Sequence, residues 1–62
     1  MNAYDIDRII NEAREAAADL EGSTEWQDAV ETKIYELTSS TADADIVCER
    51  FLTRILRSAG VI

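Results

Sequence analysis

The sequence contains no histidine, and this absence limits the chemistry that the chain can perform. Histidine is the commonest general base and metal ligand, and a triad of serine, histidine and acid cannot form without it. The two glycines, Gly22 and Gly60, both stand where a helix is expected to stop, so there is no glycine-rich phosphate-binding loop. We therefore expect no enzyme, no cofactor and no metal site.

Devices that stabilise small folds are also missing. The 62 residues include one cysteine, which excludes a disulfide within the chain, and the missing histidine argues against a structural metal. A domain of this size buries only about 60% of the surface that its unfolded chain exposes, so packed helices must supply the core. Formation of a homodimer, or binding to a partner, would bury further apolar surface.

The sequence contains no proline, no internal repeat and no low-complexity linker. We therefore predict one domain over residues 1–62. No apolar run approaches the roughly 20 residues of a membrane span, and the first residues lack the basic and apolar regions of a signal peptide. Together with the unpaired Cys48, these absences favour a cytoplasmic protein.

Acidic residues outnumber basic ones by thirteen to six, which gives a net charge of −7. This charge argues against direct binding to nucleic acid or to an anionic membrane. The charge is also uneven: residues 1–45 hold twelve acids and three bases, net −9, whereas residues 46–62 hold one acid and three bases, net +2. One end of the molecule is therefore expected to differ from the rest.

The apolar residues recur at intervals of three and four, which predicts three amphipathic helices over about residues 3–21, 25–38 and 42–59. Asn2 is expected to cap the first helix and Gly22 to end it. Thr24 and Gln27 have the spacing of a capping box for the second, with Ser23 as the alternative cap. Gly60 followed by Val61 resembles a Schellman ending for the third.

The predicted fold is a compact, all-α three-helix bundle, with antiparallel neighbours because the loops are short. In the second helix Trp26, Val30, Ile34 and Leu37 share one side, so Trp26 is interpreted as a core anchor. The third helix has the widest apolar face and is therefore expected to form the centre of the core. This face comprises Cys48, Phe51, Leu52, Ile55, Leu56 and Ala59.

Two features that could indicate a calcium site or a nucleophile are interpreted as structural. The sequences Asp5-x-Asp7 and Asp43-x-Asp45 resemble the start of a calcium loop but lack its glycine and its final glutamate, so we interpret them as first-turn acids that complement the helix dipole. Cys48 lies on the apolar face with no base to activate it, which favours a buried hydrophobe over a nucleophile.

Exposed residues that break the amphipathic pattern are candidates for contact with a partner. Tyr35 lies nearly opposite the apolar side of its helix, so it is either an interface residue or simply an exposed aromatic. Ile46, Arg50 and Arg57 lie together on the outer side of the third helix and form a secondary candidate patch. In the alternative interpretation, Ile46 covers the preceding loop and the arginines favour the helix end or pair with acids of the first helix.

The main candidate interface is the acidic surface of the first two helices. Acids three or four residues apart on a helix lie about 5–6 Å from one another and repel, which favours an external reason for keeping them; solubility or adaptation to salt is the alternative. The predicted partner-binding residues are Glu12, Glu15, Asp19, Glu25, Asp28, Glu31, Tyr35 and Glu36.

In size, acidity and lack of catalytic groups the chain resembles the small phage-encoded inhibitors, among them anti-CRISPR proteins and other DNA mimics. The resemblance covers the whole chain through composition and helicity and has no defining motif, so no residue role is carried over. It implies an inhibitor in the cytoplasm of a host cell, whose partner is a nucleic-acid-binding complex with a basic surface. The alternative function is a small helical scaffolding or dimerisation module that docks through the third helix.

Overall fold

The structure is a computed structural model that describes residues 1–60. Within this range the chain forms an all-α three-helix bundle: α1 (Ala3–Ala16), a short 3-10 turn η1 (Ala18–Leu20), α2 (Trp26–Leu37) and α3 (Thr41–Ser58). The three predicted helices and the fold class are confirmed. None of the helices in the described range has the length and apolar character needed to cross a membrane.

Helix α1 begins as the sequence predicts but ends earlier. Asn2 is its N-cap, and the Asn2 Oδ1 accepts a hydrogen bond of 2.9 Å from the backbone N–H of Asp5. The α-helix stops at Ala16 and the chain tightens into η1, which contacts α2 and leaves Leu20 half-buried. Gly22, with φ of 91°, lies in the turn that follows. The predicted end at residue 21 is therefore wrong by one short turn of tighter helix.

The predicted capping box of α2 does not form. Glu25 occupies the N-cap position and makes no capping hydrogen bond through its side chain. Ser23, the alternative cap, lies two positions before the N-cap: its Oγ accepts from the Glu25 N–H at 3.3 Å and donates to the Leu20 carbonyl at 2.7 Å. The serine thus holds the loop against the end of η1, which leaves Thr24 exposed and without the predicted role.

Helix α3 is capped by Ser40, whose Oγ accepts from the Asp43 N–H at 3.1 Å. At its other end Gly60 has φ of 76°, and its N–H donates to the Arg57 carbonyl at 3.1 Å, one of the two bonds of a Schellman ending. The predicted hydrophobic contact of Val61 lies outside the described residues.

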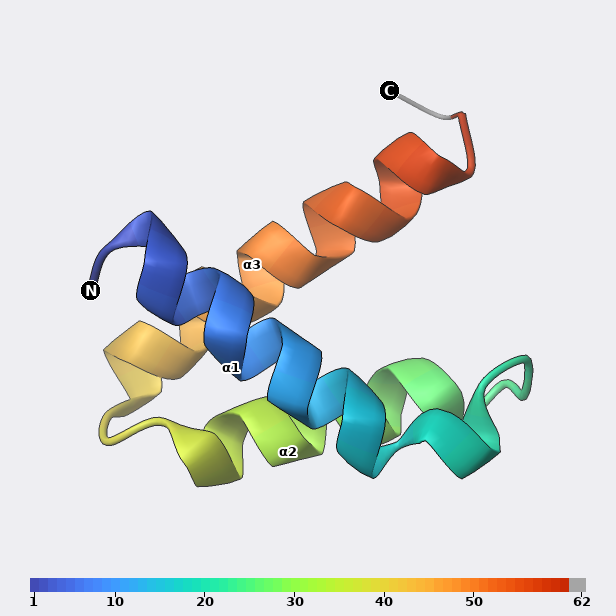
Figure 1. The fold of residues 1–62 in the computed structure, drawn as a ribbon, viewed down its shortest axis with the longest axis horizontal. Coiled ribbons are helices and arrows are strands. Elements are labelled where there is room, and N and C mark those ends of the chain that lie inside the picture. Colours follow the sequence, from blue (N-terminus) through green and yellow to red (C-terminus); the bar gives the residue numbers. More distant parts are fainter. Residues whose placement is uncertain (61–62) are drawn as a thin grey trace.

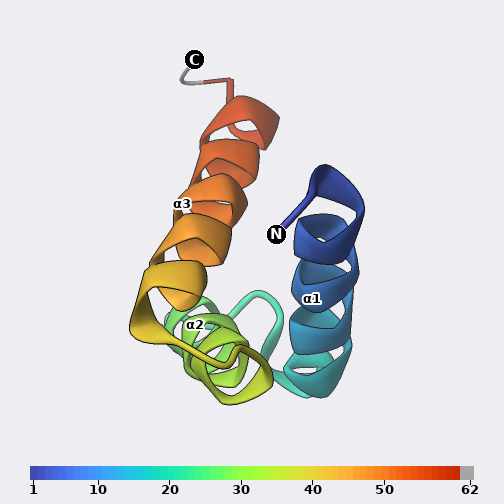
Figure 2. The same ribbon diagram turned by 90° about the vertical axis from the view of Figure 1, so that its left-hand side faces the viewer.

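The core lies where the three helices meet, and no charged side chain within residues 1–60 is buried in it. Helix α2 runs across the base, while α1 and α3 rise from it on either side (Figures 1 and 2). The buried residues are Ile9, Ile10, Ala13, Ala17, Val30, Ile34, Ala44, Val47, Cys48 and Phe51.

The prediction that α3 forms the centre of the core is wrong for its second half. Burial ends at Phe51: Leu52 and Ile55 are half-buried, Leu56 is 41% exposed and Ala59 is exposed. In Figure 1 the last turns of α3, coloured orange to red, run on past the other two helices. Leu37 of α2 is also exposed, at 36%, so the predicted apolar side of α2 ends at Ile34.

Candidate acidic interface

The acids of α1 lie on the outer side of that helix. Glu12 and Glu15 of α1 and Asp19 of the adjoining turn η1 are all exposed, and we call them the acidic ridge of α1. They are not equivalent, because the Arg8 guanidinium lies 3.2 Å from the Glu12 carboxylate and offsets its charge. Glu15 and Asp19 have no lysine or arginine nitrogen within 4.0 Å in the described part of the chain.

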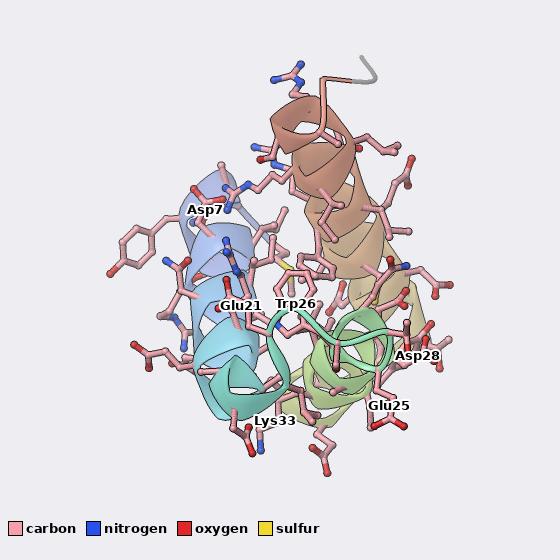
Figure 3. All side chains as sticks on the ribbon, turned by 90° about the vertical axis from the view of Figure 1, so that its right-hand side faces the viewer. Asp7, Glu21, Glu25, Trp26, Asp28 and Lys33 are labelled. Atoms are coloured by element: carbon pink, nitrogen blue, oxygen red, sulfur yellow. The ribbon has the colours of Figure 1, made fainter. Side chains whose placement is uncertain are left out.

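A second group of carboxylates runs along α2. The acidic ridge of α2 comprises Glu25, Asp28, Glu31 and Glu36, of which Glu31 is half-buried and the others are exposed. Figure 3 shows Glu25 and Asp28 together at the beginning of α2, on the side turned away from α1. Lys33 lies 3.6 Å from Glu36, so Glu36 is the one member of this ridge with a basic partner among residues 1–60.

The remaining basic residues with assigned contacts lie near the core. The Arg14 guanidinium lies over the ring of Trp26, 5.7 Å from its centroid, in a cation–π arrangement. Arg54 of α3 pairs with Asp7 of α1. Because neither of these arginines forms an ion pair with a carboxylate of the two acidic ridges, the ridges keep their negative charge.

Tyr35 is 47% exposed, as predicted, but its hydroxyl is engaged. The Tyr35 O–H donates to the Asp45 carboxylate of α3 at 2.6 Å, which ties the end of α2 to the start of α3. This hydrogen bond, with smaller contributions from desolvation and from neighbouring negative charge, raises the pKa of Tyr35 to about 12. The hydroxyl thus has a structural partner, while the ring remains open to contact.

Cys48 lies beside this pair and is buried, as the sequence predicts. Desolvation raises the pKa of its thiol, and the negative charges of Glu31 and Asp45 raise it further. Because the thiolate is the reactive form, this environment makes Cys48 a poor nucleophile. The cluster of Glu31, Tyr35, Asp45 and Cys48 joins α2 to α3.

The secondary patch is continuous along α3. Ile46 and Arg50 line one shallow depression with Thr53, and Arg50 and Arg57 line the next, again with Thr53. Ile46 is 49% exposed, and both arginines are exposed. The structure therefore brings these three residues together along α3, but the depression of Ile46 and Arg50 also borders Ile6 of α1, so it does not lie wholly on the outer side as predicted. The ion pair with α1 is formed by Arg54 instead.

Trp26 is half-buried and meets the core edge-on. Its ring lies 5.5 Å from that of Phe51 with an interplanar angle of 62°, and Figure 3 shows it between α1 and α3. The indole Nε1 is shielded from solvent and has no hydrogen-bond partner among the described residues. A groove of about 310 Å³ opens beside it, lined by Arg14, Phe51, Arg54 and Ile55 among others.

Sequence reasoning missed the residues whose partners lie on another helix. Asp7 and Arg54 are 47 positions apart, and the interpretation of Asp45 as a first-turn acid did not identify its bond to Tyr35. The separated charges of α1 and α3 were the available indication, since residues 46–62 carry the excess of arginine. Within residues 1–60 no three cysteine, aspartate or glutamate side chains gather closely enough to hold a metal ion.

No protein family model, curated protein or solved structure matches this chain. The assignment of function therefore depends on the site itself.

Proposed function

We propose that this protein is a small acidic inhibitor, without catalysis, that occupies a basic nucleic-acid-binding surface of a host complex in the manner of anti-CRISPR proteins and other DNA mimics. The observation that carries the proposal is the set of carboxylates on α1, η1 and α2, or at the start of α2, that have no basic partner within residues 1–60. These are Glu15, Asp19, Glu25, Asp28 and Glu31.

The spacing of the carboxylates supports competition with nucleic acid. The acidic ridge of α2 carries one carboxylate for about every 5 Å of helix axis, at a rise of about 1.5 Å per residue. A strand of B-DNA carries one phosphate for about every 3.4 Å, so the two linear charge densities are of the same order. A cleft lined with lysine and arginine would attract both, and electrostatic steering would speed the encounter.

The exposed ring of Tyr35 adjoins this charge and supplies the contact expected to confer specificity. Tyrosine is enriched among residues that dominate binding energy because it buries a large area at low entropic cost. Its hydroxyl is already satisfied by Asp45, so the ring can be covered without leaving a buried polar group unpaired. The secondary patch of Ile46, Arg50 and Arg57 lies on α3 and is not needed for this binding mode.

The two acidic ridges offer a matched experiment. Glu25→Gln with Asp28→Asn removes two carboxylates that lack basic partners, whereas Glu12→Gln with Glu36→Gln removes two that already pair with Arg8 and Lys33. Both double variants change the net charge from −7 to −5. If two interfacial charge contacts contribute about 0.5–1 kcal/mol each, the first variant weakens binding about 5- to 30-fold and the second changes it far less.

The binding partner is found first by capture from a cell extract on the immobilised chain, followed by elution in a salt gradient. We expect to recover a nucleic-acid-binding protein that is released by moderate salt and displaced by duplex DNA. The affinity of the recovered protein for each purified double variant is then measured. Failure to recover such a protein contradicts the proposal. So does a recovered protein that binds DNA and this chain at once, or one that binds the two double variants equally.

A further inference from the structure

The groove beside Trp26 is lined by residues from all three helices. Its lining includes Arg14 of α1, Trp26 of α2, Ile55 and Ser58 of α3, and Ala59, which follows α3. Figure 3 shows Trp26 between α1 and α3. The groove has a volume of about 310 Å³, at the lower end of the range of about 300–1,000 Å³ for pockets that hold small molecules. It therefore has room for a small molecule.

The wall of the groove is largely apolar. The ring of Trp26 packs edge-on against Phe51, with 5.5 Å between the ring centroids, so this wall rests on the core. Trp26 and Ile55 are half-buried and Ala59 is exposed, which leaves part of each side chain open to the groove. Such a wall binds the apolar part of a ligand through the hydrophobic effect.

Arg14 adds a positive charge that no carboxylate within residues 1–60 neutralises. Its guanidinium lies over the Trp26 ring, 5.7 Å from the centroid. The ion pairs of the described residues are formed by three other basic side chains, those of Arg8, Lys33 and Arg54. A guanidinium carries several N–H donors, and among residues 1–60 Arg14 donates no side-chain hydrogen bond. These donors are therefore available to a ligand.

No acidic residue lines the groove, although the chain has thirteen acids and six bases. By contrast, the depression that Ile46 lines also includes Glu49. Arg54 lines the groove as well, but Asp7 offsets its charge, so Arg14 supplies the charge that a ligand can use. A negatively charged group is therefore attracted to the groove and repelled by the acidic ridges.

We propose that this groove binds a small amphipathic carboxylate, whose apolar part packs against Trp26 and Ile55 and whose carboxylate pairs with Arg14. A guanidinium binds a carboxylate through strong, often bidentate, charge-assisted hydrogen bonds. Ser58 offers a hydroxyl donor at the same groove. No member of the acidic ridges lines the groove, so such a ligand and the proposed nucleic-acid-binding partner occupy different sites.

The first test compares two probes that share a ring system and differ in charge. Naphthylacetate carries a carboxylate, and naphthylacetamide has a neutral amide in its place. Calorimetric titration of the full chain near neutral pH is expected to give one naphthylacetate per chain, with a dissociation constant at or below about 1 mM for a ligand of this size. The amide is expected to bind at least about fivefold more weakly, because it lacks the charge that pairs with Arg14.

Two results of this titration overturn the inference. One is the absence of saturable naphthylacetate binding up to about 10 mM. The other is equal affinity for the acid and the amide, because the groove would then bind the ring system alone.

The second test compares two exposed arginines of α1. Arg14→Gln and Arg8→Gln each leave thirteen acids and five bases, which changes the net charge from −7 to −8. Arg14→Gln is expected to weaken naphthylacetate at least about fivefold and naphthylacetamide less than about twofold, and Arg8→Gln to change either less than about twofold. Arg14→Lys keeps the charge and is expected to restore part of the affinity.

The affinity for the amide shows whether the apolar wall survives the change at Arg14. A loss of naphthylacetate affinity that is equal in Arg14→Gln and Arg8→Gln overturns the inference, because the effect would then follow from net charge. An equal loss for the acid and the amide in Arg14→Gln contradicts the pairing of Arg14 with the carboxylate.

The third test fills the groove without changing Arg14. Ala59→Phe places a ring at the groove, whereas Ala42→Phe, exposed at the other end of α3, serves as the control. Ala59→Phe is expected to weaken both probes at least about fivefold and Ala42→Phe less than about twofold, while circular dichroism checks that both variants keep their helices. Unchanged binding to Ala59→Phe overturns the inference, because the probes would then bind elsewhere on the chain.

Discussion

The body of the molecule and the second half of α3 are built from similar residues yet packed very differently. In the body, α1, α2 and the first half of α3 bury ten side chains around Ile10, Val30 and Phe51. Beyond Phe51, α3 keeps the same amphipathic pattern, but its apolar side chains up to residue 60 are only half-buried or exposed. The apolar side of a helix predicts that the helix packs against another surface. It does not specify that this surface belongs to the same chain.

The largest expected difference between the two regions comes from removing one large side chain in each. Phe51→Ala removes a ring that is 1% exposed and is expected to cost about 3–5 kcal/mol, a large part of the roughly 3–9 kcal/mol typical of a chain this long. Leu56→Ala is expected to cost less than about 1 kcal/mol, because the side chain is already partly in water. Urea unfolding followed by circular dichroism at low concentration measures both; equal losses would show that the two regions are packed alike.

The next effect concerns how the helices of the body begin. Ser40→Ala removes the cap of α3 and is expected to lower the free energy of unfolding by about 1 kcal/mol. Thr24→Ala, at the position that only resembles a cap, is expected to change it by less than about 0.3 kcal/mol. Thermal unfolding of the two single variants compares them, and a larger loss for Thr24→Ala would mean that the capping box forms in solution.

A smaller effect is expected where the second half of α3 is tied to the body. The pair of Arg54 and Asp7 is partly exposed, with side chains 38% and 45% accessible, so it is expected to contribute about 0.2–1 kcal/mol. A double-mutant cycle of Arg54→Gln and Asp7→Asn isolates this coupling in low and in high salt. A coupling of zero in low salt would leave this half of α3 without an electrostatic tie to α1.

The smallest effect on stability is expected from the hydrogen bond between Tyr35 and Asp45. Because this bond raises the pKa of Tyr35 from 10.0 to about 12, its contribution is complete below pH 10 and is lost as the pH rises towards 12. Tyr4→Phe leaves Tyr35 as the one tyrosine, whose ionisation is followed by ultraviolet absorbance. Asp45→Asn is expected to move its pKa back towards 10, and an unchanged titration curve would contradict the bond.

The sequence predicted the helices because their apolar periodicity and end residues act locally. Asn2 caps α1, Asp43 occupies the first turn of α3, and Gly60 takes the left-handed conformation after its end. The end of α1 was predicted less well. Alanines 16 to 18 favour continued helix, but the chain must turn back so that Trp26 can reach Phe51, and that requirement belongs to the tertiary packing.

The uncovered half of α3 could not be predicted, because it depends on relative helix lengths. At about 1.5 Å per residue, the 18 residues of α3 span about 27 Å, whereas α1 and α2, with 14 and 12 residues, span about 21 and 18 Å. A first helix that continued to residue 21, as the pattern suggested, would have been as long as α3. The exposure of the acids in the candidate interface could be predicted from the local helix pattern, except for Glu31, which is half-buried beside α3.

The position of Trp26 gives the protein its own spectroscopic reporter. It is the one tryptophan of the chain, and it lies where α2 meets Phe51 of α3 and Arg14 of α1. Its fluorescence therefore depends on all three helices being assembled, whereas far-ultraviolet dichroism detects each helix whether or not it is packed. A condition that shifts the emission while the dichroism holds would reveal helices that have separated without unwinding.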